Sequence, residues 1–448
     1  MRIAMVGVGY VGLVSGACLS DFGHEVVCID TDEGKIAALR RAEIPIFEPG
    51  LGEIVANNLS AGRLSFTTDL GAGVRGAQAI FIAVGTPTAS GEERADLTYV
   101  FEAARQIGEA LDGYAVIVTK STVPVGAGDE IERILAQAAP SLRFSVVSNP
   151  EFLREGSAIK DFKLPDRIVI GVEDEEARHV MSDIYRPLYL NQGPVMFTGR
   201  RTAELIKYSA NAYLAMKVTF INEISNLCEQ VGADVQEVAR GIGLDNRIGR
   251  KFLNAGPGFG GSCFPKDMLA LAQTARDAHS PLRLIETVID VNEKRKQAMA
   301  DKIIRACGGS IAGKTIAVLG LTFKPNTDDM RSAPSLIIVP ALQAAGAKVV
   351  AFDPKGGKAA REMLPGVAFA DGPYDCVAGA DALVIITEWE AFRALDLKRV
   401  RASMRTPVVV DLRNIYRPAE MAALGFSYHS VGRGARKTSA SLLNSRID

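Results

Sequence analysis

The stretch Ile3-Ala4-Met5-Val6-Gly7-Val8-Gly9-Tyr10-Val11-Gly12, near the start of the chain, decides the fold. A short apolar run leads into glycines spaced G-x-G-x-x-G, and a helical stretch follows. In this setting the glycines allow a tight turn and let a pyrophosphate approach the helix N-terminus. Asp30 ends the next apolar run, 18 residues after Gly12, where its carboxylate would bind the ribose hydroxyls of an adenosine. The stretch therefore predicts a dinucleotide-binding βαβ unit.

The cofactor predicted for this unit is NAD. The charge of Asp30 would repel the 2′-phosphate of NADP, and Lys35 is near enough in sequence to moderate that preference. A strand-to-helix turn without a ligand is the alternative. A second pattern, at 308–315, formally matches the phosphate-binding loop G-x-x-x-x-G-K-[ST]. It follows a helical stretch and leads into a strand, the reverse of what that loop requires, so we interpret Gly313 as a turn.

Apolar strand-like runs alternate with helical stretches in two parts of the chain, which predicts two parallel sheets. The runs are 3–6, 26–29, 79–84, 115–118 and 144–147 in the first part, and 315–319, 348–352, 382–386 and 407–410 in the second. The segment 346–353 parallels 23–30, so the second part echoes the first. The predicted fold class is α/β, with two Rossmann-like doubly wound domains.

A long segment from about 202 to 231 contains no proline or glycine, and its apolar residues recur at three- and four-residue steps. This predicts an amphipathic helix of about thirty residues, which connects two domains or packs against a partner chain. The predicted domains are an N-terminal NAD-binding domain (1–200), a central helical domain (201–300) and a C-terminal α/β domain (301–432). A flexible basic tail is expected at 433–448.

The composition excludes several classes of protein. The 448 residues carry 51 Lys and Arg against 52 Asp and Glu, so the formal charge is −1. This balance gives no overall field for nucleic acid or an anionic membrane, although a local basic pocket could bind a phosphate. With four His and six cysteines without a C-x-x-C, a metal site is not expected. Apolar stretches are too short to span a membrane, and the glycine motif explains the N-terminus better than a signal peptide does.

The most unusual segment is Gly256-Pro257-Gly258-Phe259-Gly260-Gly261-Ser262-Cys263-Phe264-Pro265-Lys266-Asp267. We interpret its glycines as letting the backbone approach a ligand closely. Cys263 follows them beside Lys266, a setting that could lower its pKa and make it a thiolate. A buried structural cysteine is an equally good interpretation from the residues alone. The six cysteines as a whole are expected to be thiols in a reducing cytoplasm.

For several other polar residues the sequence allows either a role in the site or an ordinary place on the solvent-exposed surface. Lys207 and Asn211 share one face of the long helix, although a lysine beside apolar residues more often snorkels to solvent. Glu151 and Glu155 could act chemically or lie on a solvated helix surface. Loops that begin after the strands at 79–84 and 115–118 carry Thr86 and Thr122. Because ligands bind at the carboxyl ends of parallel strands, we expect these loops to contact the cofactor.

Together these segments resemble the UDP-glucose/GDP-mannose dehydrogenase family, over 1–417. The resemblance is carried by G-V-G-Y-V-G, S-T-V-P (121–124), N-P-E-F-L-R-E-G (149–156), the Lys207/Asn211 helix, G-F-G-G-S-C-F-P-K-D (258–267) and G-L-T-F-K-P (320–325). It implies oxidation of the C6 hydroxyl of a nucleotide sugar to a carboxylate with two NAD molecules. It also implies a central region that forms a homodimer, and a C-terminal domain that binds UDP.

The resemblance implies a role for each motif residue. Those implied to contact NAD are Gly7, Gly9, Tyr10, Val11, Gly12, Asp30, Lys35, Thr86, Thr122, Glu155 and Arg331. Those implied to contact the sugar nucleotide are Glu151, Phe152, Leu153, Lys207, Asn211, Arg247, Phe259, Gly260, Lys324 and Arg413, with Arg247 supplied by the neighbouring subunit. The implied catalytic residues are Cys263, Lys207, Asn211, Asp267, Glu151 and Thr122.

The chemistry of these residues suits the implied reaction. Lys207 and Asn211 would stabilise the negative charge that develops on the substrate oxygen. The Cys263 thiolate would add to the aldehyde and give a thiohemiacetal, whose oxidation yields a thioester. Asp267 and Glu151 are candidates to position or deprotonate the water that hydrolyses it. We expect a cytoplasmic enzyme that converts UDP-glucose to UDP-glucuronate. An enzyme for GDP-mannose or UDP-N-acetylmannosamine, or a regulator that binds nucleotide sugars without turnover, is the alternative.

Overall fold

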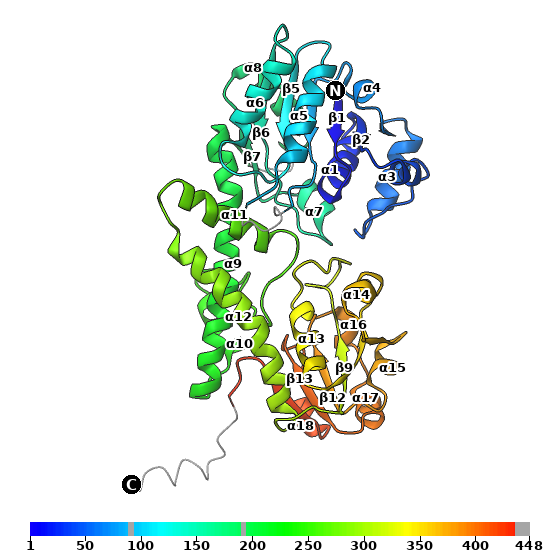
Figure 1. Cartoon of the computed structure of the whole chain (residues 1–448), viewed down its shortest axis with the longest axis vertical. Coiled ribbons are helices and arrows are strands. Elements are labelled where there is room, and N and C mark those ends of the chain that lie inside the picture. The colour runs from blue at the N-terminus through cyan, green and yellow to red at the C-terminus, as the bar shows by residue number, and fades with distance from the viewer. Residues whose placement is uncertain (88–93, 190–193, 435–448) are drawn as a thin grey trace. The chain divides into compact units, whose positions relative to one another are not determined.

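The computed structural model describes residues 1–87, 94–189 and 194–434 of the chain. It divides into two compact units, each described here by itself (Figure 1). Unit 1 comprises 1–210 and 269–281, and unit 2 comprises 211–268 and 282 onward. Helices α9 (Arg200–Val231) and α11 (Phe264–Asp277) each contribute residues to both units.

Unit 1 is built on an eight-stranded sheet with the order β3-β2-β1-β4-β5-β6-β7-β8. Strands β1 to β6 pair in parallel, β7 runs antiparallel to β6, and β8 is parallel to β7. The strands are β1 (Arg2–Val6), β2 (Glu25–Ile29), β3 (Leu64–Thr67), β4 (Ala79–Ile82), β5 (Ala115–Thr119), β6 (Phe144–Ser148), β7 (Ile168–Gly171) and β8 (Val195–Thr198). The order of the first six strands is that of a Rossmann fold, with its switch point between β1 and β4.

Helices cover both faces of this sheet (Figure 1). Within unit 1 the helices are α1 (Tyr10–Asp21), α2 (Glu33–Arg40), α3 (Leu51–Ser60), α4 (Leu70–Val74), α5 (Thr98–Ala110), α6 (Ala127–Ala138), α7 (Ala158–Lys163) and α8 (Glu175–Tyr189). Strand β1 shows why two layers are needed. Ile3 and Met5 pack with α1, α3, α7 and α8, whereas Ala4 and Val6 pack with α5 and α6. Because successive side chains point to opposite faces, an apolar strand requires helices on both sides.

Unit 2 contains a six-stranded parallel sheet with the order β11-β10-β9-β12-β13-β14. Its strands are β9 (Thr315–Leu319), β10 (Lys348–Phe352), β11 (Ala368–Phe369), β12 (Ala382–Ile385), β13 (Val408–Asp411) and β14 (Ser427–Ser430). Its helices, besides parts of α9 and α11, are α10 (Val235–Gly243), α12 (Arg283–Ala306), α13 (Ser335–Ala344), α14 (Gly357–Met363), α15 (Pro373–Val377), α16 (Glu390–Arg393), α17 (Leu397–Ser403) and α18 (Pro418–Ala423).

The predicted fold class, two Rossmann-like α/β domains with a helical region between them, is confirmed. The first turn of each sheet is even built alike. Gly7 and Gly320 both have positive φ, at +94° and +86°. The N–H of the next residue then donates to the aspartate that follows the second strand, 2.8 Å from Val8 to Asp30 and 2.7 Å from Leu321 to Asp353.

Other predictions about the chain's organisation have mixed outcomes. Helix α9 covers the predicted range 202–231, and Gly313, with φ +74°, forms the turn into β9 as interpreted. Arg433, the first residue of the predicted tail, pairs with Asp234 at 3.0 Å. The rest of that tail, from 435 on, lies outside the described residues. The domain boundaries at 200, 300 and 432 stay predictions. In the described part of the chain, no helix is long and apolar enough to cross a membrane.

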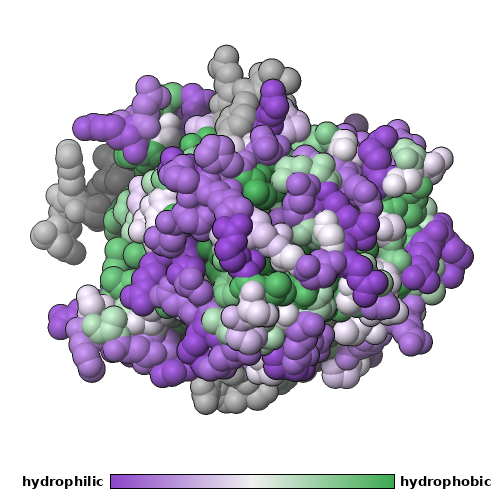
Figure 2. All heavy atoms as spheres, turned by 90° about the horizontal axis from the view of Figure 1, so that it is seen from above, coloured by the Kyte–Doolittle hydropathy of each residue, from purple (hydrophilic) through white to green (hydrophobic). Residues whose placement is uncertain are grey.

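Figure 2 shows one face of the molecule in space-filling form. Hydrophilic and hydrophobic side chains are mixed across this face.

Candidate active site

The glycine turn after β1 has two different kinds of glycine. A Cβ at Gly7 would lie 2.8 Å from the Ala83 carbonyl, and a Cβ at Gly12 would lie 1.9 Å from the Gly7 oxygen. Both are therefore required by the packing of the turn itself. A Cβ at Gly9 would meet no atom of the described residues within 4 Å. The exposed turn at Gly9 is where a pyrophosphate can approach the start of α1, so these residues fit a dinucleotide.

Asp30 lies beside this turn and is held as a carboxylate. It accepts hydrogen bonds from the Val8 N–H at 2.8 Å, the Asp32 N–H at 3.1 Å and the Lys35 ammonium at 3.0 Å. Burial alone would raise the pKa of Asp30, but these three donors outweigh it and lower the pKa. An ionised Asp30 suits ribose hydroxyls and disfavours a 2′-phosphate. Lys35 is engaged with Asp30 in an ion pair.

Glu48, which belongs to none of the sequence motifs, connects Tyr10 to the backbone that follows Glu155. The Tyr10 hydroxyl donates to the Glu48 carboxylate. Glu48 is buried and also accepts the N–H groups of Gly156, at 2.6 Å, and Ala158, at 2.8 Å. The segment that carries Glu155 is thereby tied to the glycine turn. In the sequence, Glu48-Pro49-Gly50 indicates a turn and nothing about the contacts of Glu48.

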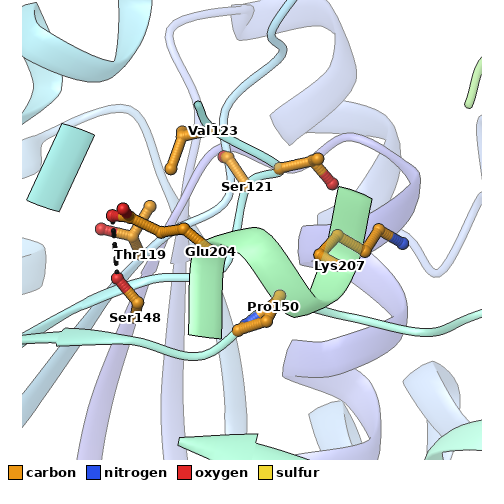
Figure 3. Close-up of a pocket in the computed structure, with 8 residues that line it drawn as sticks. Thr119, Ser121, Val123, Ser148, Pro150, Glu204 and Lys207 are labelled. Carbon is orange, nitrogen blue, oxygen red and sulfur yellow. Dashed lines mark hydrogen bonds between the residues drawn. The ribbon is translucent and has the colours of Figure 1, made fainter. Parts of the chain in front are cut away.

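Thr86 and Thr122 follow β4 and β5, two neighbouring parallel strands, as predicted. Thr86 is buried, and Thr122 is partly exposed. Thr122 lines a cavity of about 10 Å³, which is the room that one water molecule takes. The other lining residues are Thr119, Ser121, Val123, Ser148, Pro150, Glu204 and Lys207 (Figure 3).

Glu204 anchors helix α9 to this loop. In Figure 3 its carboxylate points toward Thr119 and Ser148, while the Lys207 ammonium points the other way. The carboxylate accepts the N–H groups of Gly126 at 2.7 Å and Gly128 at 2.9 Å, at the start of α6, and the Ser148 hydroxyl at 3.2 Å. It thus caps the N-terminus of α6 from another helix. No local sequence pattern indicates this role of Glu204.

Lys207 forms a buried ion pair with Glu151. Its ammonium donates to the Glu151 carboxylate at 2.9 Å and to the Glu151 carbonyl at 2.7 Å. The two side chains are 4% and 5% exposed, so the interpretation of Lys207 as a snorkelling lysine is wrong. Glu151 lies in a buried loop, so the interpretation that it belongs to a solvated helix surface is also wrong. Burial works to raise the pKa of Glu151, but Lys207, the Leu153 N–H and Lys120 lower it.

Phe152 and Leu153 continue this loop. The Phe152 ring is covered by the Arg167 guanidinium, 3.7 Å from its centroid, and Lys207 Nζ lies 5.4 Å away. The Leu153 N–H donates to the second oxygen of Glu151 at 2.5 Å. Both residues therefore help to fix the Glu151–Lys207 pair.

In unit 2 the predicted catalytic residues gather at the start of α11. Asn211 donates to Asp267 at 2.7 Å, and Lys266 pairs with the other oxygen of Asp267 at 2.7 Å. Cys263 directly precedes the helix, and its carbonyl accepts the Asp267 N–H at 2.9 Å. Cys263 is partly exposed, and the other five cysteines are buried free thiols. A partly exposed cysteine at a helix N-terminus is where a thiolate is favoured.

The glycine-rich loop packs closely against other residues of unit 2. A Cβ at Gly256 would lie 2.9 Å from Arg413, one at Gly260 would lie 2.3 Å from the Ser332 carbonyl, and one at Gly261 would lie 2.7 Å from the Phe323 ring. The packing of the loop therefore requires these three glycines, and their close approach to a ligand stays a prediction. In the same loop, the Phe259 N–H donates to the Asn292 side-chain oxygen at 2.8 Å.

The remaining predicted residues are basic. Arg413 donates to the carbonyls of Ile386 at 2.8 Å and Phe323 at 3.2 Å, beside the glycine-rich loop. Lys324 Nζ lies 5.3 Å from the Phe323 ring centroid. Arg331 and Arg247 have guanidinium groups that are 63% and 89% exposed and that pair with nearby aspartates.

The structure thus brings the predicted residues together in groups within each unit. The glycine turn, Asp30 and Lys35 form one group in unit 1, and Glu151 and Lys207 form another. Asn211, Cys263 and Asp267 form a group in unit 2. Lys207 and Asn211 both lie on α9, one helical turn apart.

Three family models match the chain in order. They describe the UDP-glucose/GDP-mannose dehydrogenase family: its NAD-binding domain at 1–189, its central domain at 201–294 and its UDP-binding domain at 317–418. The chain belongs to this family. As a family member, it is an NAD-dependent dehydrogenase, and the predicted cofactor, NAD, is confirmed.

Individual relatives in this dehydrogenase family cover nearly the whole chain. A UDP-glucose 6-dehydrogenase of Rhizobium meliloti is 62% identical over 97% of this chain and 100% of its own length. One from Bacillus subtilis is 50% identical over 97% of this chain and 94% of its own. The solved structure of a UDP-glucose dehydrogenase from Pyrobaculum islandicum has a TM-score of 0.89 and 38% identity, and covers 97% of this chain and 98% of its own.

Proposed function

We propose that the chain oxidises the C6 hydroxyl of UDP-glucose to the carboxylate of UDP-glucuronate. The observation that supports this most strongly is the 62% identity to a UDP-glucose 6-dehydrogenase along its whole length. The ion pair of Lys207 with Glu151, the pair of Asn211 with Asp267 and the partly exposed Cys263 supply the functional groups that the reaction needs. NAD, when bound, accepts the hydride that the substrate gives up in each oxidation.

Lys207 and Asn211 are proposed to act in the first oxidation. The hydroxyl loses its proton and its carbon gives up a hydride, so negative charge develops on the oxygen. A lysine ammonium and an asparagine amide one turn apart on a rigid helix can both donate to that oxygen. The Glu151 carbonyl and carboxylate hold the ammonium in a fixed direction.

Cys263 is proposed to act in the second oxidation. Its thiolate adds to the aldehyde carbon, and the aldehyde oxygen takes a proton, which gives a thiohemiacetal. Loss of a hydride and the hydroxyl proton from this adduct gives a thioester with Cys263. Water then attacks the thioester and releases the thiolate and the carboxylate. The N-terminal position of Cys263 on α11 favours the thiolate.

Asp267 and Glu151 are the groups proposed to position or deprotonate the water that hydrolyses the thioester. Thr122 is a further proposed catalytic residue. The Asp267 carboxylate already accepts a hydrogen bond from Asn211, and the Glu151 carboxylate accepts one from Lys207. Each carboxylate can therefore accept a hydrogen bond from water either beside this partner or in its place. Asp267 is 1% exposed, so its carboxylate is held in a fixed place by its protein partners.

The substrate contacts are also proposed from the family resemblance. Lys324 and Arg413 would hold the diphosphate and the sugar, with Phe259, Gly260, Phe152 and Leu153 around it. Arg331 and Glu155 would reach the cofactor. Arg247, whose guanidinium is 89% exposed, would serve the site of a neighbouring subunit.

A homodimer is proposed because α9 presents an exposed apolar stripe in unit 2. Tyr213, Phe220, Leu227 and Val231 are 48% to 66% exposed. They recur at steps of seven, seven and four residues, so they lie on one face of the helix. A second copy of the chain is the partner that this face fits best. We also propose a cytoplasmic location, because Cys263 must stay reduced.

The choice of substrate is tested with the purified protein, NAD and one nucleotide sugar at a time. NADH absorbance and product mass are followed with UDP-glucose, GDP-mannose and UDP-N-acetylmannosamine. We expect the largest kcat/KM with UDP-glucose and a product with the mass of UDP-glucuronate. A larger kcat/KM with either other sugar would replace UDP-glucose in the proposal.

A further inference from the structure

A second lysine, Lys120, is buried in unit 1 immediately after β5. The residue is 5% exposed. Its ammonium donates to the Asn149 side-chain oxygen at 3.0 Å and to the Tyr185 hydroxyl at 3.2 Å. It also lies 5.9 Å and 5.8 Å from the ring centroids of Phe162 and Tyr185. Among the residues that the structure describes, no carboxylate oxygen lies within 4.0 Å of it.

A buried ammonium bonded only to neutral groups is costly and calls for an explanation. Burial, together with the like charge of Lys207, lowers the pKa of Lys120 to about 8, and the charge of Glu151 opposes that change. Burial raises the pKa of Tyr185, which keeps its hydroxyl neutral. The charged groups that face Lys120 are therefore Glu151 and Lys207.

The backbone places Lys120 next to the Glu151 loop. Asn149, the partner of Lys120, is separated from Glu151 by one residue, and its N–H donates to the Thr119 carbonyl at 2.9 Å. Asn149 also donates to the Val169 carbonyl at 2.8 Å. The ends of β5 and β6 are thus joined next to the loop that carries Glu151. Lys120, Lys207 and Glu151 together form a cluster of two cations and one anion.

We propose that Lys120 is a positioning residue that fixes the Glu151 loop through Asn149 and adds a buried positive charge on the side of Lys207, where negative charge develops on the substrate oxygen. The proposal rests on the proposed function, because it concerns how Lys207 is held for the oxidation. The single excess positive charge of the cluster also favours an oxyanion at Lys207.

The test compares the pH dependence of kcat/KM for Lys120→Gln, Lys120→Arg and Tyr185→Phe with the wild type. Gln keeps a donor for Asn149 but removes the charge, and Arg keeps a charge that does not titrate. Tyr185→Phe removes a hydrogen bond and leaves the ammonium, so it is the matched control. Thermal unfolding shows which variants fold.

We expect wild-type kcat/KM to fall as the pH rises through about 8, because Lys120 loses its proton. Lys120→Gln is expected to be about tenfold slower at pH 7 and to lack this fall, because it lacks the buried positive charge at every pH. Lys120→Arg should lose the fall and keep most of the activity, and Tyr185→Phe should keep both. If Lys120→Arg does not fold, Lys120→Gln alone decides.

Lys120→Gln with the wild-type rate and the wild-type fall would overturn the proposal, and so would the same profile change in Tyr185→Phe. The assay uses whichever nucleotide sugar the wild type oxidises. A failure of UDP-glucose as substrate is therefore distinguishable from a failure of Lys120.

Discussion

Glu151 and Lys207 show what single residues could and could not reveal. They are 56 residues apart in the chain, and their charged groups meet at 2.9 Å. The helical spacing placed Lys207 and Asn211 on one face, which the structure bears out. The partners of these two residues lie far away in the chain, Glu151 in a loop and Asp267 in α11, so no local pattern identifies them. Removing one partner of a buried ion pair strongly destabilises the folded protein, because the other charge is left buried without compensation.

Replacement of Cys263 is the prediction at this scale. In Cys263→Ala the thiohemiacetal cannot form, so we expect no UDP-glucuronate and NAD affinity within about twofold of wild type, because the nucleotide turn is untouched. Product mass and NAD titration measure the two effects. Cys307→Ala, at a buried cysteine of unit 2, should still make the acid. Acid production by Cys263→Ala at the wild-type rate would remove Cys263 from the mechanism.

Among the elements, the long apolar strands and α9 were predicted, and short or edge strands were missed. Strand β8 offers only three apolar residues in a row, Val195 to Phe197, and β14 (Ser-Tyr-His-Ser) offers no apolar run. Strand β7 is fully buried but has only four residues, and periodicity cannot tell so short a run from a helix. The glycine-rich loop was found by composition, but its packing against Ser332 and Phe323 required the fold.

The glycine turn gives a prediction with its own matched pair. Gly9→Ala meets open space, so we expect the unfolding free energy to stay within about 0.5 kcal/mol of wild type. The added methyl sits where the pyrophosphate approaches, so NAD should bind about tenfold or more weakly, a loss of about 1.4 kcal/mol. Gly12→Ala collides with the Gly7 oxygen and should lower the unfolding free energy by about 3 kcal/mol.

Denaturant unfolding and NAD titration measure these effects. Equal NAD affinity in Gly9→Ala and wild type would show that the cofactor does not approach this turn.

For the whole molecule, the sequence predicted two sheets of the same kind, and the structure shows where they differ. Asp30 is partly exposed beside Lys35. Its counterpart Asp353 is buried and also accepts the Trp389 indole N–H at 3.2 Å. The first turn is therefore open to a ligand, whereas the second is closed by its own domain. The repeat was visible in the sequence, but the burial of Asp353 depended on a tryptophan 36 residues away.

The apolar stripe on α9 gives the prediction at this scale. Phe220→Glu places a charge in the proposed dimer interface, so we expect the dimer dissociation constant to rise by about a hundredfold, equivalent to about 3 kcal/mol. Light scattering coupled to size-exclusion chromatography measures it. Tyr99→Glu, at a tyrosine on α5 that is 59% exposed, is the control and should leave the mass unchanged. A monomeric wild type would contradict the dimer.

The count of NADH formed per UDP-glucose consumed tests the central claim most directly. With limiting UDP-glucose and excess NAD, the absorbance at the end of the reaction gives the ratio, and mass spectrometry identifies the product. Two oxidations on one substrate predict two NADH and UDP-glucuronate. One NADH with accumulated aldehyde would contradict the account.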